Sequence, residues 1–120
     1  STDDEPDIWQ KSLSGELELW VALGLPSDKI LRQSCGKAGK VVIYAYGGRP
    51  AEVWWDKIKG STTRFDNLQV MNLSEDETRD LAGLANRSMK LQINIQDGEV
   101  MVSADDRIAY VTPVKWKDVA

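Results

Sequence analysis

The strongest constraint on the fold is an alternating segment followed by a tight-turn signal. Residues Met89–Ile95 (MKLQINI) alternate between apolar and polar side chains, as in a strand with one buried face. The pair Asp97-Gly98 follows and is typical of the type I′ turn in a two-residue β-hairpin. Because residues Glu99–Ser103 form the next apolar segment, the sequence predicts a hairpin and therefore antiparallel pairing.

Further strands are expected where apolar residues alternate or where β-branched and aromatic residues cluster. These segments are residues 16–25, 40–46, 65–73 and 108–111, the last after a turn at Asp105-Asp106 and confined to an edge or a terminus by Pro113. In residues 16–25 the odd-numbered apolar side chains share one face, so we expect Glu16, Glu18 and Trp20 on the opposite, polar face. Residues 40–46 are apolar on both faces, which favours a central strand.

Two helices are predicted from capping signals. Ser27 and Asp28 begin one, and Gly36 ends it. Ser74 and Glu77 have the spacing of a capping box at the start of the other, which Asn86 closes. Residues 8–13 fit a short helix, whereas residues 49–61 (RPAEVWWDKIKGS) fit either a helix begun at Pro50 or an edge strand, and that choice stays open.

Taken together, the segments predict a single α+β domain over residues 8–120. We expect a mainly antiparallel sheet of about five to six strands with two or three short helices. The acidic residues 1–7 (STDDEPD) lack a bulky apolar side chain and are expected to form a disordered tail. We find no alternating strand–helix–strand pattern, so no nucleotide-binding crevice is expected.

The amino-acid composition excludes several kinds of catalytic, redox and metal-binding site. The 120 residues contain no histidine and one cysteine, Cys35, which excludes imidazole bases, internal disulfides and CxxC zinc sites. Cys35 is expected to pack as a small apolar residue. The net charge is 15 − 19 = −4, which argues against nucleic acid or an anionic membrane surface as a partner. No apolar run is long enough to span a bilayer. We therefore expect no catalytic residue, no metal, no cofactor and no enzymatic activity.

Aromatic residues outside the regular patterns are the main candidates for a binding site. Trp54-Trp55 follows the YGGRP segment, and Trp20 is expected on a polar face; tryptophans so placed commonly anchor protein interfaces. Carboxylates close by would steer a basic or neutral protein partner. The predicted partner-binding residues are Glu16, Glu18, Trp20, Tyr46, Arg49, Trp54, Trp55 and Asp56.

These features favour an inhibitor or immunity protein that occludes a cationic, cell-wall-type hydrolase. Numbering from Ser1 favours a periplasmic or secreted chain whose signal peptide has been removed. One alternative is a cytoplasmic adaptor, or a regulator encoded by a phage or plasmid, that binds a host protein and can do so as a homodimer formed through its exposed edge strand. Another is a small-ligand-binding domain that uses Tyr44, Tyr46 and Trp55.

Overall fold

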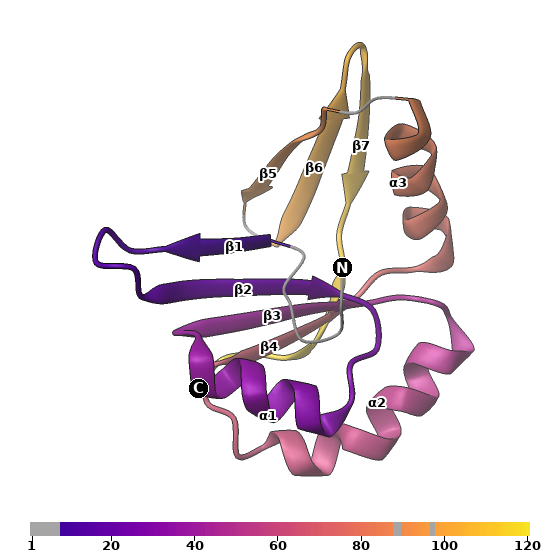
Figure 1. Ribbon diagram of the computed structural model, residues 1–120. Coiled ribbons are helices and arrows are strands. Elements are labelled where there is room, and N and C mark those ends of the chain that lie inside the picture. Colours follow the sequence, from indigo (N-terminus) through magenta and orange to yellow (C-terminus); the bar gives the residue numbers. More distant parts are fainter. Residues whose placement is uncertain (1–7, 88–89, 97) are drawn as a thin grey trace.

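Eight strands and three helices are formed by the residues that the computed structural model describes, which are 8–87, 90–96 and 98–120 (Figure 1). Their bounds are β1 Ile8–Lys11, β2 Leu17–Leu23, α1 Asp28–Lys37, β3 Lys40–Ala45, α2 Arg49–Thr62, β4 Leu68–Asn72, α3 Glu75–Arg87, β5 Gln92–Gln96, β6 Glu99–Ala104, β7 Arg107–Val111 and β8 Val114–Lys117. The α+β class predicted from the sequence is confirmed. The expected tail at residues 1–7 lies outside the described residues.

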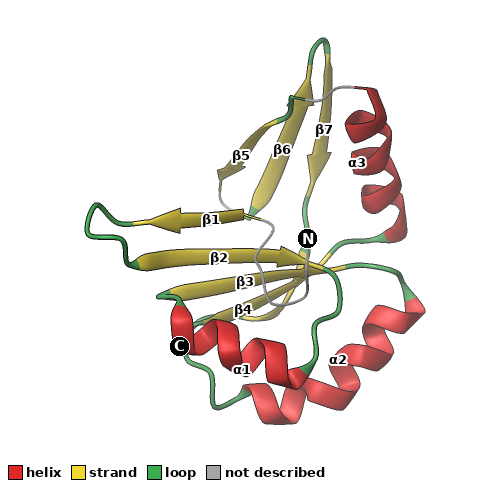
Figure 2. Cartoon of the chain, viewed as in Figure 1, coloured by secondary structure: helices red, strands yellow, loops and turns green. Residues whose placement is uncertain are grey.

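The larger sheet has the strand order β1-β2-β3-β4-β8 among the described residues. Its three central strands β2, β3 and β4 are parallel, while β1 and β8 pair antiparallel at its two sides. The helices α1 and α2 make the two crossovers and lie on the same side of this sheet (Figure 2). The expectation that strands and helices do not alternate is therefore wrong, because residues 49–62 form the second crossover helix.

The first hydrophobic core lies between this sheet and the helices α1 and α2. Its fully buried side chains include Leu31 of α1, Val41 and Ile43 of β3, and Leu68 and Val70 of β4. Each such side chain contributes roughly 1.5–3 kcal/mol by leaving water. The apolar pattern of residues 40–46 is thus explained by a central strand, as predicted.

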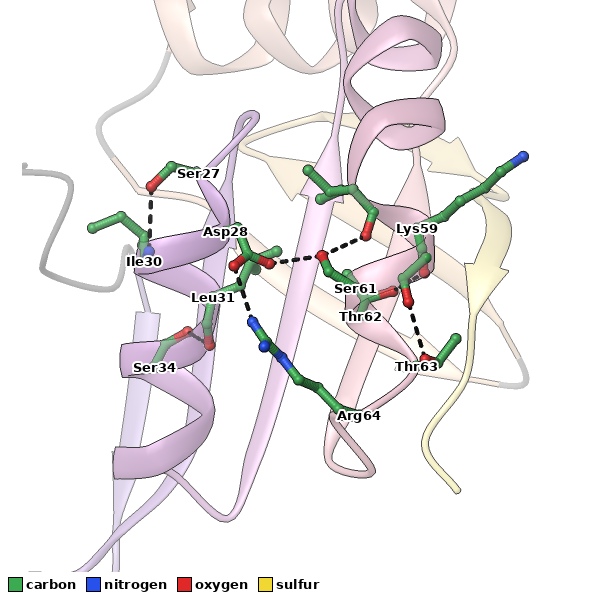
Figure 3. A network of polar contacts seen from close by, with 12 residues as sticks. Ser27, Asp28, Ile30, Leu31, Ser34, Lys59, Ser61, Thr62, Thr63 and Arg64 are labelled. Atoms are coloured by element: carbon green, nitrogen blue, oxygen red, sulfur yellow. Dashed lines mark hydrogen bonds and ion pairs between the residues drawn. The ribbon is translucent and has the colours of Figure 1, made fainter.

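A polar network joins the start of α1 to the end of α2 (Figure 3). The two carboxylate oxygens of Asp28 accept hydrogen bonds from Ser61 Oγ at 2.8 Å and from the Arg64 guanidinium at 2.9 Å. Ser27 Oγ accepts the amide of Ile30 at 3.3 Å and so caps α1, as the sequence predicted. These contacts link the first turn of α1 to the last turn of α2 and to Arg64, just after it.

The smaller sheet is antiparallel and has the order β5-β6-β7. The hairpin of β5 and β6 confirms the strands predicted around Asp97-Gly98, although Met89 and Asp97 themselves lie outside the described residues. Helix α3 packs on β6 and β7 and buries a second core made of Leu73, Leu84, Val100, Val102, Ala104 and Val111.

The capping box of α3 is formed as predicted. Ser74 Oγ accepts the amide of Glu77 at 3.1 Å, and a carboxylate oxygen of Glu77 accepts the amide of Ser74 at 3.0 Å. The second oxygen of Glu77 accepts the amide of Thr112 at 2.7 Å, just beyond β7. The cap therefore also holds α3 against the smaller sheet.

The short helix expected at residues 8–13 is wrong. Residues Ile8–Lys11 form the edge strand β1, which pairs with β2 in the register Ile8↔Val21 and Trp9↔Trp20. A segment this short fits both helical and extended patterns, and the backbone hydrogen bonds that β2 offers decide the outcome.

Candidate functional site

Trp20 belongs to the core and offers no exposed surface. It is only 5% exposed and packs with Val41 and Leu31 on the side of β2 that α1 and α2 cover. The prediction of a polar face around Trp20 is therefore wrong. The apolar residues of the opposite face, Leu19 and Val21, are only partly covered.

Trp54 and Trp55 lie on the helix α2 and not on a loop. The indole Nε1 of Trp54 donates a hydrogen bond to the carbonyl oxygen of Pro26 at 2.6 Å, and the Trp55 ring stacks on Trp116 at 5.8 Å between centroids. Both side chains are partly buried against the first core. These contacts hold α2 against the segment before α1 and against β8, and of the two structures that the sequence left open for residues 49–61 the helix is the one that forms.

The remaining polar residues predicted near Trp54 are exposed but dispersed. Arg49 pairs with Glu52 at 3.8 Å, and Asp56 with Lys59 at 3.3 Å, each within α2. Such exposed pairs contribute little to stability. Tyr46 is exposed just after β3. These residues do not form one patch with Glu16 and Glu18.

Glu16 and Glu18 belong instead to the hairpin of β1 and β2, which projects from one side of the larger sheet (Figure 1). Both side chains are exposed. Trp9, on the edge strand β1, is 56% exposed, and Leu13 in the connecting turn is fully exposed. Sequence reasoning missed Trp9 and Leu13 as candidate binding residues because residues 8–13 were assigned to a helix.

The turn that presents Leu13 is held by several hydrogen bonds. The Ser12 amide donates to the Glu16 carbonyl oxygen at 2.8 Å, and the Gly15 amide donates to the Ser12 carbonyl oxygen at 3.0 Å. Ser12 Oγ accepts the Glu16 amide at 3.1 Å and lies 2.9 Å from Ser14 Oγ. Gly15 has φ +88°, a conformation that glycine adopts without strain. These hydrogen bonds order the backbone of the turn, and the turn exposes the Leu13 side chain to water.

A groove of about 640 Å³ lies elsewhere, between α3 and the edge strand β7. It is lined by Arg79, Asp80, Gly83, Leu84, Arg107, Ile108, Ala109 and Tyr110. None of the residues predicted to bind a small ligand lines it. Tyr44 packs against the second core, where burial raises the pKa of its hydroxyl above the ordinary value of 10.0.

Cys35 packs against the first core and is half-buried. Burial raises the pKa of its thiol to about 11, and the nearby Lys117 ammonium opposes this shift only in part. A thiol that stays protonated at neutral pH is a poor nucleophile.

No helix of the described residues is long and apolar enough to cross a bilayer.

The fold and the hairpin define a class: an α+β protein in which two helices cover one side of a mixed sheet and a hydrogen-bonded hairpin extends that sheet. The chain belongs to the YaeQ family, whose model, described as YaeQ protein, matches residues 1–113. It is 32% identical over 115 residues to the YaeQ protein of Escherichia coli K12 and 35% identical over 103 residues to that of Salmonella typhi. These matches cover 96% and 86% of this chain, but only 64% and 57% of the relatives.

Solved structures show the same fold. The YaeQ protein from Xanthomonas axonopodis pv. citri superposes with a TM-score of 0.80 at 36% identity, over 97% of this chain and 66% of that one. The YaeQ protein from Pseudomonas syringae gives 0.78 at 23% identity, over 98% and 64%, and supports the fold alone. The chain thus spans less than two thirds of the length of its curated relatives.

Proposed function

We propose that the chain is a protein-binding domain that inserts the β1–β2 hairpin into a concave surface of its partner. In its specific form, the proposal is an inhibitor or immunity protein that occludes the active cleft of a basic, cell-wall-type hydrolase in the periplasm or outside the cell. The proposed role is binding, with no catalytic step carried out by this domain.

The single observation that carries the proposal is the fully exposed Leu13 on an ordered turn. Burying one leucine side chain in a partner releases roughly 1.5–3 kcal/mol. Because hydrogen bonds to Ser12 already order the turn, little conformational entropy is lost on binding. The half-exposed ring of Trp9 on β1 offers further apolar area of the kind that anchors interfaces.

Charge supports a basic partner. Glu16 and Glu18 are exposed on the same hairpin, and the whole chain carries a net charge of −4. Residues 8–23 contain one cation, Lys11, and two carboxylates, so the net charge of the hairpin is −1. Acidic side chains around an apolar tip would accelerate encounter with a cationic cleft, and salt would slow it.

The test is capture from a periplasmic extract followed by an inhibition assay. The baits are the wild-type chain, Leu13→Asp, and the matched control Val114→Asp, which places the same charge at an exposed apolar residue elsewhere, the valine at the start of β8. We expect the wild type and Val114→Asp to capture and inhibit one basic hydrolase, with association slowed by salt, and Leu13→Asp to lose both effects. Equal capture by all three baits would refute the role of the hairpin.

Two alternatives make different predictions in parallel experiments. A cytoplasmic adaptor or phage- or plasmid-encoded regulator, including one that acts as a homodimer, would capture a protein from a cytoplasmic extract with the same baits and show no inhibition. A small-ligand-binding domain would use the groove beside β7, where Arg107 would bind an anionic ligand, helped by Arg79, which also pairs with Asp76, and opposed by Asp80. Anionic metabolites would then raise the melting temperature of the wild type and not of Arg107→Ala.

A further inference from the structure

The edge strand β5 carries an apolar surface that α3 does not cover. Ile93 and Ile95 are 51% and 59% exposed. Their register partners Val102 and Val100 on β6 are buried in the second core beneath α3. The isoleucines therefore extend the apolar face of the smaller sheet beyond α3.

The backbone of β5 is also open on one side. In the described part of the chain, β6 pairs with one side of β5 and no strand pairs with the other. Gln96 and Glu99 are register partners next to the turn, so hydrogen-bonded pairs recur at Asn94↔Met101 and Gln92↔Ser103. By this alternation, the amide and carbonyl groups of Ile93 and Ile95 point to the open side. An uncharged open edge of this kind is a template for pairing with another strand.

The sequence of β5 indicates which strand can pair with its open edge. Residues 92–96 read Gln-Ile-Asn-Ile-Gln, which is the same in both directions. When two such strands pair antiparallel about a two-fold axis at Asn94, Ile93 lies opposite Ile95 of the second copy, and Gln92 opposite Gln96. Isoleucine then meets isoleucine on one face, amide meets amide on the other, and no charged residues are opposed.

We propose that two copies of this chain pair through β5, antiparallel and centred on Asn94, to form a continuous six-stranded sheet. This pairing uses the backbone groups that point to the open side of β5. Ile93 of one copy and Ile95 of the other form a hydrogen-bonded pair, and the two Asn94 residues form a non-hydrogen-bonded pair. The four isoleucines form one apolar strip between the two α3 helices. The same edge is used by both copies, so the assembly closes at a dimer.

The interface is small, since one five-residue strand per copy contributes less than the ~800 Å² per partner of a standard complex. We therefore expect an equilibrium that depends on concentration. The proposal is independent of the hairpin at Leu13, which lies on the other sheet. Loss of hairpin binding and loss of β5 pairing can thus be observed separately in the same preparations.

Engineered cysteines test both the pairing and its register. In the proposed dimer the Cα atoms of the two Asn94 residues lie ~4.5 Å apart, within disulfide reach. We expect Asn94→Cys to form a disulfide-linked dimer under mild oxidation. Gln96→Cys alone is the matched control, because its two copies lie roughly 13 Å apart along the strands at about 3.3 Å per residue. Gln96→Cys mixed with Gln92→Cys restores the cross-link.

The wild type controls for the native cysteine, since Cys35 is half-buried in the first core. Sedimentation equilibrium of the wild type and of Ile93→Lys gives an independent measurement, with a concentration-dependent dimer expected only for the wild type. Three results would overturn the proposal: a monomeric wild type at every concentration, cross-linking of Gln96→Cys as efficient as that of Asn94→Cys, or an Asn94→Cys that links only to a different protein.

Discussion

Trp9 and Trp20 are direct partners across the β1–β2 ladder, yet Trp9 is 56% exposed and Trp20 only 5%. The difference arises from position in the sheet. Trp20 lies on a strand with β1 on one side and β3 on the other, beneath α1 and α2, whereas Trp9 lies on the edge strand. One register pair therefore joins a core residue to a candidate binding residue.

Replacing each of these tryptophans with alanine should separate stability from binding. Trp20→Ala empties part of the first core and should lower the free energy of unfolding by ~3–5 kcal/mol. Trp9→Ala should lower it by about 1 kcal/mol or less, while it weakens partner binding. Urea denaturation followed by circular dichroism measures both. Equal destabilisation by the two variants would contradict the difference in burial.

The face of β2 could not be predicted from periodicity alone. Leu17, Leu19 and Val21 alternate with Glu18 and Trp20, and a rule that buries the more uniformly apolar face chooses the odd positions. In the structure two helices cover the other face, and the volume of Trp20 fills the space above Val41. Which face the crossover helices cover depends on the handedness of the connections, which local sequence does not encode.

Gly48 and Gly60 lie at the start and near the end of α2 and should respond to alanine with opposite signs. Gly48 has φ +68°, which strains any other residue, and a Cβ there would also displace the flexible carboxylate end of Glu75, so Gly48→Ala should lower the free energy of unfolding by ~1–3 kcal/mol, mostly through the backbone. Gly60 is helical with open space around it, so Gly60→Ala should raise stability by roughly 0.5–1 kcal/mol. Thermal melting of both variants tests the signs.

The double variant Gly48→Ala/Glu75→Ala separates the two causes at Gly48. It removes the collision and leaves the backbone strain, so it should recover only part of the loss. Full recovery would show that the positive φ costs nothing at this position.

Lys117 and Lys115 provide a second matched pair at the C-terminal strand β8. Lys117 Nζ donates to the carbonyl oxygens of Phe65 at 2.8 Å and Leu68 at 3.2 Å, which links β8 to the first residue of β4 and to the segment before it. Lys115 Nζ makes an exposed pair with Asp118 at 3.0 Å. Lys117→Ala should therefore cost ~1.5–3 kcal/mol and Lys115→Ala less than ~0.5 kcal/mol, by chemical denaturation. A larger loss for Lys115→Ala would contradict this assignment.

Local chemistry predicted more of the fold than of the candidate site. The capping box at Ser74 and the hairpin after Ile95 depend on a few neighbouring residues, and both were predictable. Residues 49–62 were ambiguous because Trp54 and Trp55 contact Pro26 and Trp116, which are distant in sequence. For the same reason Leu13 was missed: its exposure depends on β1 pairing with β2 and not on its own neighbours.

The stability of the protein should fall at alkaline pH because two partly buried acidic groups, Cys35 and Tyr44, lose their protons more readily in the unfolded chain. Burial raises the pKa of the Cys35 thiol from its ordinary value of 9.0 to about 11. Between these two pH values the unfolded chain releases the thiol proton while the folded chain keeps it, so the folded state binds more protons and stability must fall as pH rises. Burial raises the pKa of Tyr44 as well, which adds a loss of the same sign above its ordinary value of 10.0.

The measurement is the free energy of unfolding against pH for the wild type, Cys35→Ala and Tyr44→Phe. The absolute stability of each variant also reflects its changed packing, so the slopes are compared and not the values. We expect a shallower decline between pH 9.0 and about 11 for Cys35→Ala, and for Tyr44→Phe a shallower decline only above pH 10.0. Since the folded thiol stays protonated, a thiol reagent should also modify native Cys35 far more slowly than the urea-unfolded chain. Equal slopes together with rapid modification of the native chain would show that the thiol is solvated, and that the first core is open at α1.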